Sequence, residues 1–223
     1  MQKSQQVLTA KSSPLIIERV QGRPDMITVG INVAMAAPDV AMYADYVHLR
    51  KVRDGVQVIF GKTHPLVEGE IVQAADISFP FRAFVNQLYK SVNSVRPGGQ
   101  PSFKESVDQA AKRFGYEKID GLAEPKQMKQ VTAFRSNFVA MALQEDDAAI
   151  DFHHLDAATM QAALQAVAAN AGQAPLLGFK GVLRVVVSPS LLLYFLETAC
   201  KTAEEIKAAT PGIEESPTVE VTQ

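Results

Sequence analysis

The sequence lacks the features that would place it in a membrane or mark it for export. No apolar run approaches the roughly 18 residues that a membrane span needs, and the longest candidate, Leu191 to Phe195, is far shorter. The first residues, Met1 to Gln6, contain neither the apolar stretch nor the cleavage site of a secretory signal. We therefore expect a cytoplasmic protein with no membrane span.

Cysteine is almost absent as well. The single residue, Cys200, excludes an intramolecular disulfide and fits a reducing compartment. Its spacing from Leu193 and Leu196 puts the three side chains on one helical face. Since no histidine or second cysteine is adjacent in sequence to lower the thiol pKa, the pattern favours a buried core position over a reactive thiol.

Neither sign of charge dominates, because the sequence has 22 basic and 24 acidic residues and a net charge of −2. Such a balance is a poor match for a polyanion. The densest basic stretch, His48 to Arg53, is more typical of a solvated strand end than of a phosphate site. We do not expect a nucleic-acid partner.

The common catalytic motifs are missing too. The chain has no Gly-x-Ser-x-Gly elbow, no His-Glu-x-x-His zinc helix and no Walker loop. Ser78 and Ser188 stand where helices should begin, so both are interpreted as helix caps and not as nucleophiles. The acidic pair Asp146 and Asp147 lies at an expected hairpin turn, where aspartate is common. The sequence thus favours a protein that is not an enzyme and holds no cofactor.

What the sequence does contain is enough apolar material for a folded core. Hydrophobic residues make up 47% and charged residues 21%, close to globular averages. The apolar patterns predict an α+β protein, with antiparallel sheets packed by helices. Expected strands cover 14–20, 26–36, 42–49, 56–60, 71–77, 131–142, 148–154 and 181–187, and expected helices cover 80–93, 102–115, 157–169 and 189–210.

Proline and glycine residues that interrupt helices and strands divide the chain into two units with a similar order of secondary-structure elements. Arg96 to Pro101 carries two prolines and two glycines and is the best linker. We expect a flexible tail at 1–13, a first α+β unit at 14–95, a linker with a short helix at 96–130, a second unit at 131–210 and an acidic tail at 211–223. Each unit should hold an antiparallel sheet of three or four strands.

The two units look like diverged tandem copies. Asn32–Leu49 and Phe138–Leu155 share the tetrapeptide Val-Ala-Met-Ala, one Asp and the pair His-Leu. Each stretch is followed, in the same order, by a β-rich segment, a serine (Ser78 or Ser188) and an apolar helix with a proline near its start. Two slightly longer stretches, Val29 to Leu49 with Ile77-Ser78 and Arg135 to Leu155 with Val187 to Pro189, resemble short bacterial proteins grouped only as a domain of unknown function. The resemblance supports the architecture and implies no catalytic or binding residues.

Two pairs of residues in the repeat could carry chemistry. His48 and His154 are equivalent in the alignment, and so are Asp45 and Asp151. Strand alternation points Asp45 and His48 to opposite faces, so one strand cannot hold a metal by itself. An enzyme or metal protein would need all four residues to converge between the copies, and this stays open as an alternative.

The apolar helix that begins after Ser188 is the remaining candidate surface. Its run from Leu191 to Leu196 is apolar on all sides, which indicates burial on two sides. We expect burial between the copies, or a homo-oligomer or partner interface anchored by Leu191, Tyr194 and Phe195. The favoured interpretation is a non-enzymatic binding or assembly protein of unknown process. A holdase chaperone, similar in element order to the export chaperone SecB, is the alternative.

Overall fold

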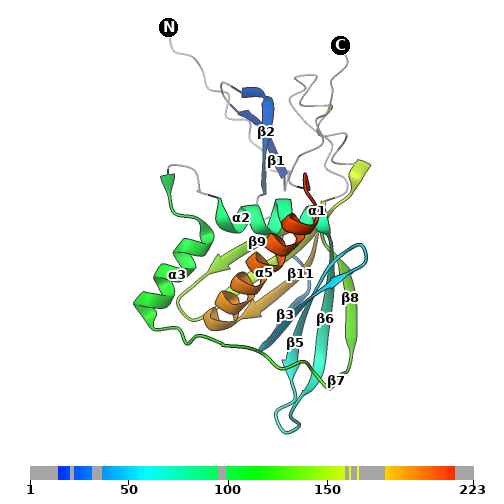
Figure 1. Ribbon diagram of the computed structural model, residues 1–223, viewed down its shortest axis with the longest axis vertical. Coiled ribbons are helices and arrows are strands. Elements are labelled where there is room, and N and C mark those ends of the chain that lie inside the picture. Colours follow the sequence, from blue (N-terminus) through cyan, green and yellow to red (C-terminus); the bar gives the residue numbers. More distant parts are fainter. Residues whose placement is uncertain are drawn as a thin grey trace. The chain divides into compact units, whose positions relative to one another are not determined.

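The computed structural model describes residues 15–20, 23–31, 37–94, 99–158, 161, 165 and 179–213, and it is an α+β protein (Figure 1). Two compact units divide the chain. The smaller comprises Met1–Ala37 and Leu155–Gly181, and the larger comprises Pro38–His154 and Val182–Gln223. Within the smaller unit, β1 (Leu15–Val20) and β2 (Arg23–Ile31) pair as an antiparallel hairpin.

Two sheets build the larger unit. The first sheet runs in the order β4, β5, β6, and both β7 and β8 pair in parallel along the far edge of β6. The second sheet runs in the order β3, β11, β10, β9. The strands are β3 (Ala41–Tyr43), β4 (Tyr46–Val52), β5 (Gly55–Thr63), β6 (Glu70–Pro80), β7 (Gln127–Met128), β8 (Val131–Arg135), β9 (Phe138–Leu143), β10 (Ala148–Leu155) and β11 (Phe179–Val187).

The chain passes from one sheet into the other at two places. Between β3 and β4, the amide of Ala44 still donates to a carbonyl of β11, whereas the next amide, that of Asp45, donates to a carbonyl of β5. Between β8 and β9, the amide of Ser136 donates to β6 and that of Asn137 donates to β10. The two sheets are therefore joined at both edges, and backbone pairing runs round a closed ring. Away from these two crossings, the strands β3, β4, β8 and β9 each pair along one edge within the described residues.

Three helical segments complete the larger unit. A continuous segment consists of α1 (Phe81–Ala83), the π-helix η1 (Phe84–Tyr89) and α2 (Lys90–Asn93). α3 (Phe103–Phe114) begins at a capping box in which Ser102 and Glu105 exchange hydrogen bonds, as the sequence predicts. It ends at Gly115, whose φ of 70° is easily adopted by glycine.

The long helix α5 (Pro189–Ala209) has the predicted cap, because the Ser188 hydroxyl accepts a hydrogen bond from the amide of Leu191. The matching prediction for Ser78 is wrong. Ser78 lies inside β6, and the cap position of α1 is Pro80, which has no side-chain cap hydrogen bond. The strand continues for three residues beyond the expected end at residue 77.

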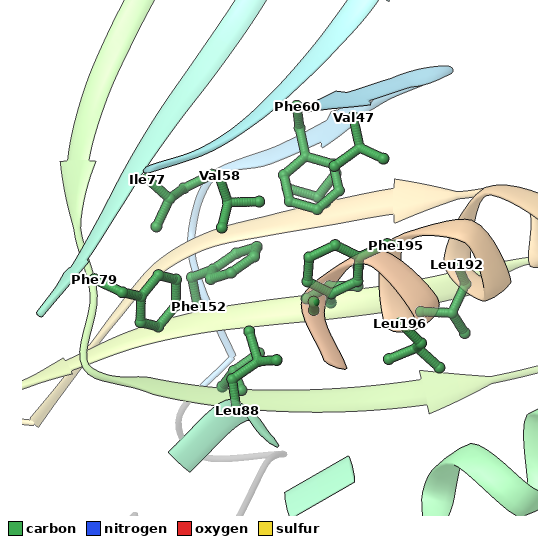
Figure 2. Packing of buried hydrophobic residues seen from close by; sticks show 14 of the residues in the cluster. Val47, Val58, Phe60, Ile77, Phe79, Leu88, Phe152, Leu192, Phe195 and Leu196 are labelled. Atoms are coloured by element: carbon green, nitrogen blue, oxygen red, sulfur yellow. The ribbon is translucent and has the colours of Figure 1, made fainter. Parts of the chain in front are cut away.

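The core lies between the inner faces of the two sheets and the buried faces of the helices. Phe195 of α5 packs against Phe60 of β5 with ring centroids 5.4 Å apart, and Phe60 packs against Phe152 of β10 at 5.7 Å. Figure 2 shows these rings close together, with Leu88 of η1 nearby. Each fully buried side chain of this size stabilises the fold by about 1.5–3 kcal/mol. One cluster thus holds both sheets and α5 together.

Strands of the two predicted copies are mixed within each sheet, so the copies are not separate domains. β3 of the first copy pairs with β11 of the second, and β8 of the second pairs with β6 of the first. The repeat alignment also sets β4 against β10, yet β10 lies between two strands of one sheet whereas β4 follows a crossing between sheets. Val33–Ala36 and most of the expected 157–169 helix lie outside the described residues. The tandem duplication stays a prediction.

Candidate functional site

The candidate site is built on the outer face of the first sheet, starting from the alternation of β4. Val47 is buried in the main core, so its neighbours Tyr46 and His48 point to the opposite face, followed by Arg50. The loop 116–126 runs from α3 to β7 without helix or strand. It is fixed beside this face where the amide of Lys126 donates to the carbonyl of Gly69 at 2.8 Å.

A pocket of about 210 Å³ lies between β4 and this loop. We call it the β4 pocket, and its lining residues are Tyr46, His48, Arg50, Ile59, Glu124, Pro125 and Met128. A small second core of Tyr46, Ile59, Ile71 and Ala74, with Leu122 and Met128 packed on it, supports one side. The pocket therefore has an apolar base, and charged side chains of both signs lie around it.

Tyr46 is the most unusual residue of the pocket. Only 4% of its surface is exposed, and its hydroxyl is a buried polar group with no hydrogen-bond partner in the described structure. Burial, reinforced by the negative charge of Glu124 and by Tyr194, raises the Tyr46 pKa to about 12. The phenol is therefore neutral at physiological pH and keeps both a donor and an acceptor unused. A buried hydroxyl left without a partner costs about 1–3 kcal/mol.

Glycine at position 61 makes room for this tyrosine. Gly61 lies opposite Tyr46 in the β4–β5 ladder. A Cβ atom there would lie 2.5 Å from Cγ2 of Ile71 and 3.6 Å from Cδ1 of Tyr46. Any larger residue would thus push into the small second core beneath the pocket.

Arg50 is held in place by a chain of polar side chains across the sheet. Its Nε donates to Oε1 of Gln57 at 2.6 Å, and Nε2 of Gln57 donates to Oδ2 of Asp76 at 3.2 Å. Burial raises the pKa of Asp76, and the positive charge of Arg50 acts in the opposite direction. The hydrogen bond to Gln57 uses the Nε of Arg50, so its two Nη groups remain as donors, and Arg50 is one of the lining residues of the pocket.

The predicted Asp and His pairs are not brought together. Asp45 accepts hydrogen bonds from the amide and hydroxyl of Thr63 at 2.7 and 2.8 Å, which holds the β5 end against the sheet crossing. Asp151 accepts two 2.7 Å hydrogen bonds from Arg184 and is committed to that ion pair. His154 shares the face of β10 that bears Phe152, whereas His48 lines the β4 pocket.

These positions bear directly on the metal alternative. Across the residues that can be placed, no three His, Cys, Asp or Glu side chains lie close enough together to hold a metal ion. Both aspartates already have strong partners, one a hydroxyl and amide pair and the other a guanidinium. The four repeated residues therefore offer no shared site.

The predicted partner-binding residues also need correction. Leu191 and Phe195 are buried in the core of their own chain, where Phe195 contacts Phe60. Only Tyr194 is half-buried, and it packs at the margin of the core. The apolar stripe of α5 is thus buried within its own chain, against β4 and the helices η1 and α3. Cys200 is half-buried beside Asn93, and burial raises the pKa of its thiol.

A wider hollow of about 450 Å³ lies on the same sheet near the β4–β5 turn. Its charged lining residues are Arg53, Asp54 and Arg135, all exposed. None of these three is a buried polar group without a hydrogen-bond partner, so the hollow lacks the kind of feature that Tyr46 gives to the β4 pocket. The β4 pocket is the better candidate because the Tyr46 hydroxyl supplies such a feature.

Sequence reasoning included His48 but missed Tyr46, Arg50 and Glu124 as pocket residues. The alternation of Tyr46, His48 and Arg50 on one strand face was a usable signal. Glu124 comes from a loop that is distant in sequence, and no pattern indicates where that loop lies.

Comparison with known proteins gives no family for the chain. No protein-family model matches it, and no curated protein or solved structure shows significant similarity to it. Among the helices that the structure describes, none is long and apolar enough to cross a membrane. The geometry of the β4 pocket is therefore the basis for any functional assignment.

Proposed function

We propose that this chain is a non-enzymatic binding protein whose ligand occupies the β4 pocket. The observation that carries the proposal concerns Tyr46, a residue that lines the pocket: its hydroxyl is buried and has no hydrogen-bond partner in the described structure. A buried polar group without a protein partner calls for a water molecule, an ion or a ligand. A bound ligand that hydrogen-bonds to this hydroxyl would remove the cost of its burial.

The chemistry of the pocket supports binding in preference to catalysis. A phenol with a pKa of about 12 is a poor base or nucleophile at neutral pH, but it is a good hydrogen-bond partner. Arg50 is held by Gln57 in a fixed orientation, which suits recognition of a planar anionic group. Apolar contact from Ile59 and Met128 would add affinity without reacting.

The holdase alternative receives less support. Such a chaperone needs a broad exposed apolar groove for unfolded clients. In the described part of the chain, the large exposed apolar side chains are spread over separate strands, loops and one helix end. They are Val40, Tyr43, Val52, Leu66, Val67, Phe114 and Val131.

Ligand-observed NMR with a library of small fragments tests the proposal. We expect fragments that bind the wild-type protein to lose their saturation-transfer signals in Glu124→Trp, which fills the pocket from the loop. The matched control is Glu117→Trp, because Glu117 is also exposed and lies on the same loop but does not line the pocket. Binding that survives Glu124→Trp, or no fragment binding at all, would refute the proposal.

A further inference from the structure

We propose that the ligand of the β4 pocket is a small zwitterion with an aliphatic side chain, that is, a free α-amino acid of about the size of leucine. This inference rests on the proposed function and adds the chemical class of the ligand. Three independent properties of the pocket lead to it: its size, the charges of its walls and the apolar character of the rest.

Size limits the ligand first. A water molecule takes up about 30 Å³ in the liquid, so 210 Å³ corresponds to roughly seven waters. That space suits a compact molecule of about seven to ten non-hydrogen atoms.

The charges of the pocket walls come next. Arg50 contributes one positive charge and Glu124 one negative charge to the same small pocket. A ligand that carries only an anion would bring a like charge near Glu124, and a ligand that carries only a cation would bring a like charge near Arg50. A zwitterion satisfies both walls, with its carboxylate on the Nη groups of Arg50 and its ammonium on Glu124.

The Tyr46 hydroxyl and the apolar walls complete the match. The neutral phenol can donate to a carboxylate or accept from an ammonium, so it fits either end of the ligand. Ile59, Pro125 and Met128 present carbon surface to whatever lies between the charges. An aliphatic side chain would bury that surface, whereas a second polar group would find no partner there.

Opening of the loop is part of the proposal, because the Tyr46 hydroxyl is shielded from solvent in the structure. The covering loop 116–126 contains neither helix nor strand, and Glu124 and Pro125 lie on it. We infer that this loop shifts to admit the amino acid and then closes over it. The unsatisfied hydroxyl makes the empty, closed arrangement costly and favours the liganded one.

Three probes of similar shape test the class of ligand: L-leucine, 4-methylpentanoate, which lacks the ammonium, and 3-methylbutylamine, which lacks the carboxylate. Binding is measured by amide chemical-shift titration of ¹⁵N-labelled protein. We expect wild type to bind leucine about 3- to 10-fold more tightly than either analogue, because each analogue loses one of the two charge pairs.

Conservative variants test which pocket residue binds the ammonium end of the ligand and which binds the carboxylate end. Glu124→Gln should abolish the preference for leucine over 4-methylpentanoate, and Arg50→Gln should abolish the preference over 3-methylbutylamine. Tyr46→Phe should weaken all three probes while circular dichroism shows an intact fold. A wild-type protein that ignores leucine, or binds an analogue as tightly, overturns the amino-acid assignment. If fragments still compete for the pocket and Glu124→Trp still blocks them, the binding function stands; if they do not, both proposals fail.

Discussion

Replacement of Phe195 by alanine tests whether α5 belongs to the core of its own chain. Phe195 has 0% of its surface exposed and contacts Phe60 from the opposite layer. Phe→Ala changes at buried sites cost about 3–5 kcal/mol, depending on how far the surroundings collapse into the cavity. Because the two sheets are joined at both edges, they cannot easily approach each other, and we expect a loss of about 4 kcal/mol.

Urea unfolding followed by circular dichroism measures this loss, since the chain has no tryptophan to report by fluorescence. For a chain of this size the same change should lower the Tm by about 8–16 °C. Lys201→Ala is the control, because Lys201 is exposed on the same helix and its replacement should change stability by less than about 0.5 kcal/mol. A loss below about 1 kcal/mol for Phe195→Ala would show that Phe195 is not packed in the core, and a loss that depends on protein concentration would indicate an intermolecular interface.

Three further changes test other parts of the structure. Ser188→Ala should lower the unfolding free energy by about 0.5–2 kcal/mol because a helix cap is lost, whereas Ser78→Ala loses no cap; equal costs in urea unfolding would contradict the assignment. Arg184→Leu should cost about 3–5 kcal/mol by leaving the buried Asp151 carboxylate without its partner, and a near-neutral result would show that the ion pair is not buried as described. The folded-state pKa of Asp76 is raised, so wild type should gain stability as the pH falls through that pKa towards the ordinary value of 3.8; Asp76→Asn should lack this gain, and parallel pH profiles would refute the burial of the carboxyl.

Local signals in the sequence were reliable where one short segment decides the outcome. The capping box at Ser102 and the Ser188-Pro189 start both place helix ends correctly, because a cap depends on residues within one turn. Alternating patterns also located most strands of the larger unit. Ser78 failed as a cap because pairing with β5 extends β6 to Pro80, and that pairing is a tertiary effect.

The sheet connections could not be predicted because they depend on contacts between distant segments. β6 pairs in parallel with β8, which follows α3 and a long loop, and β3 pairs in parallel with β11 near the other end of the chain. Hydrophobic periodicity indicates which face of a strand is buried but not which strand lies beside it. The assumption of two separate copies therefore favoured two small sheets, when the chain forms two sheets that share strands from both halves.

The same limitation explains why the repeated Asp and His residues were overvalued and Tyr46 was overlooked. Identical residues at matched positions suggested common chemistry, yet Asp45 and Asp151 have different partners. Asp45 accepts hydrogen bonds from Thr63 at a sheet crossing, and Asp151 forms an ion pair with Arg184. A residue's partners, and not its recurrence, decide whether its polar atoms are available for function. Tyr46 has an apolar ring that packs in a small core and a hydroxyl that the described fold leaves without a partner. Only the position of Glu124 and Pro125 over β4 turns that hydroxyl into a candidate for ligand recognition.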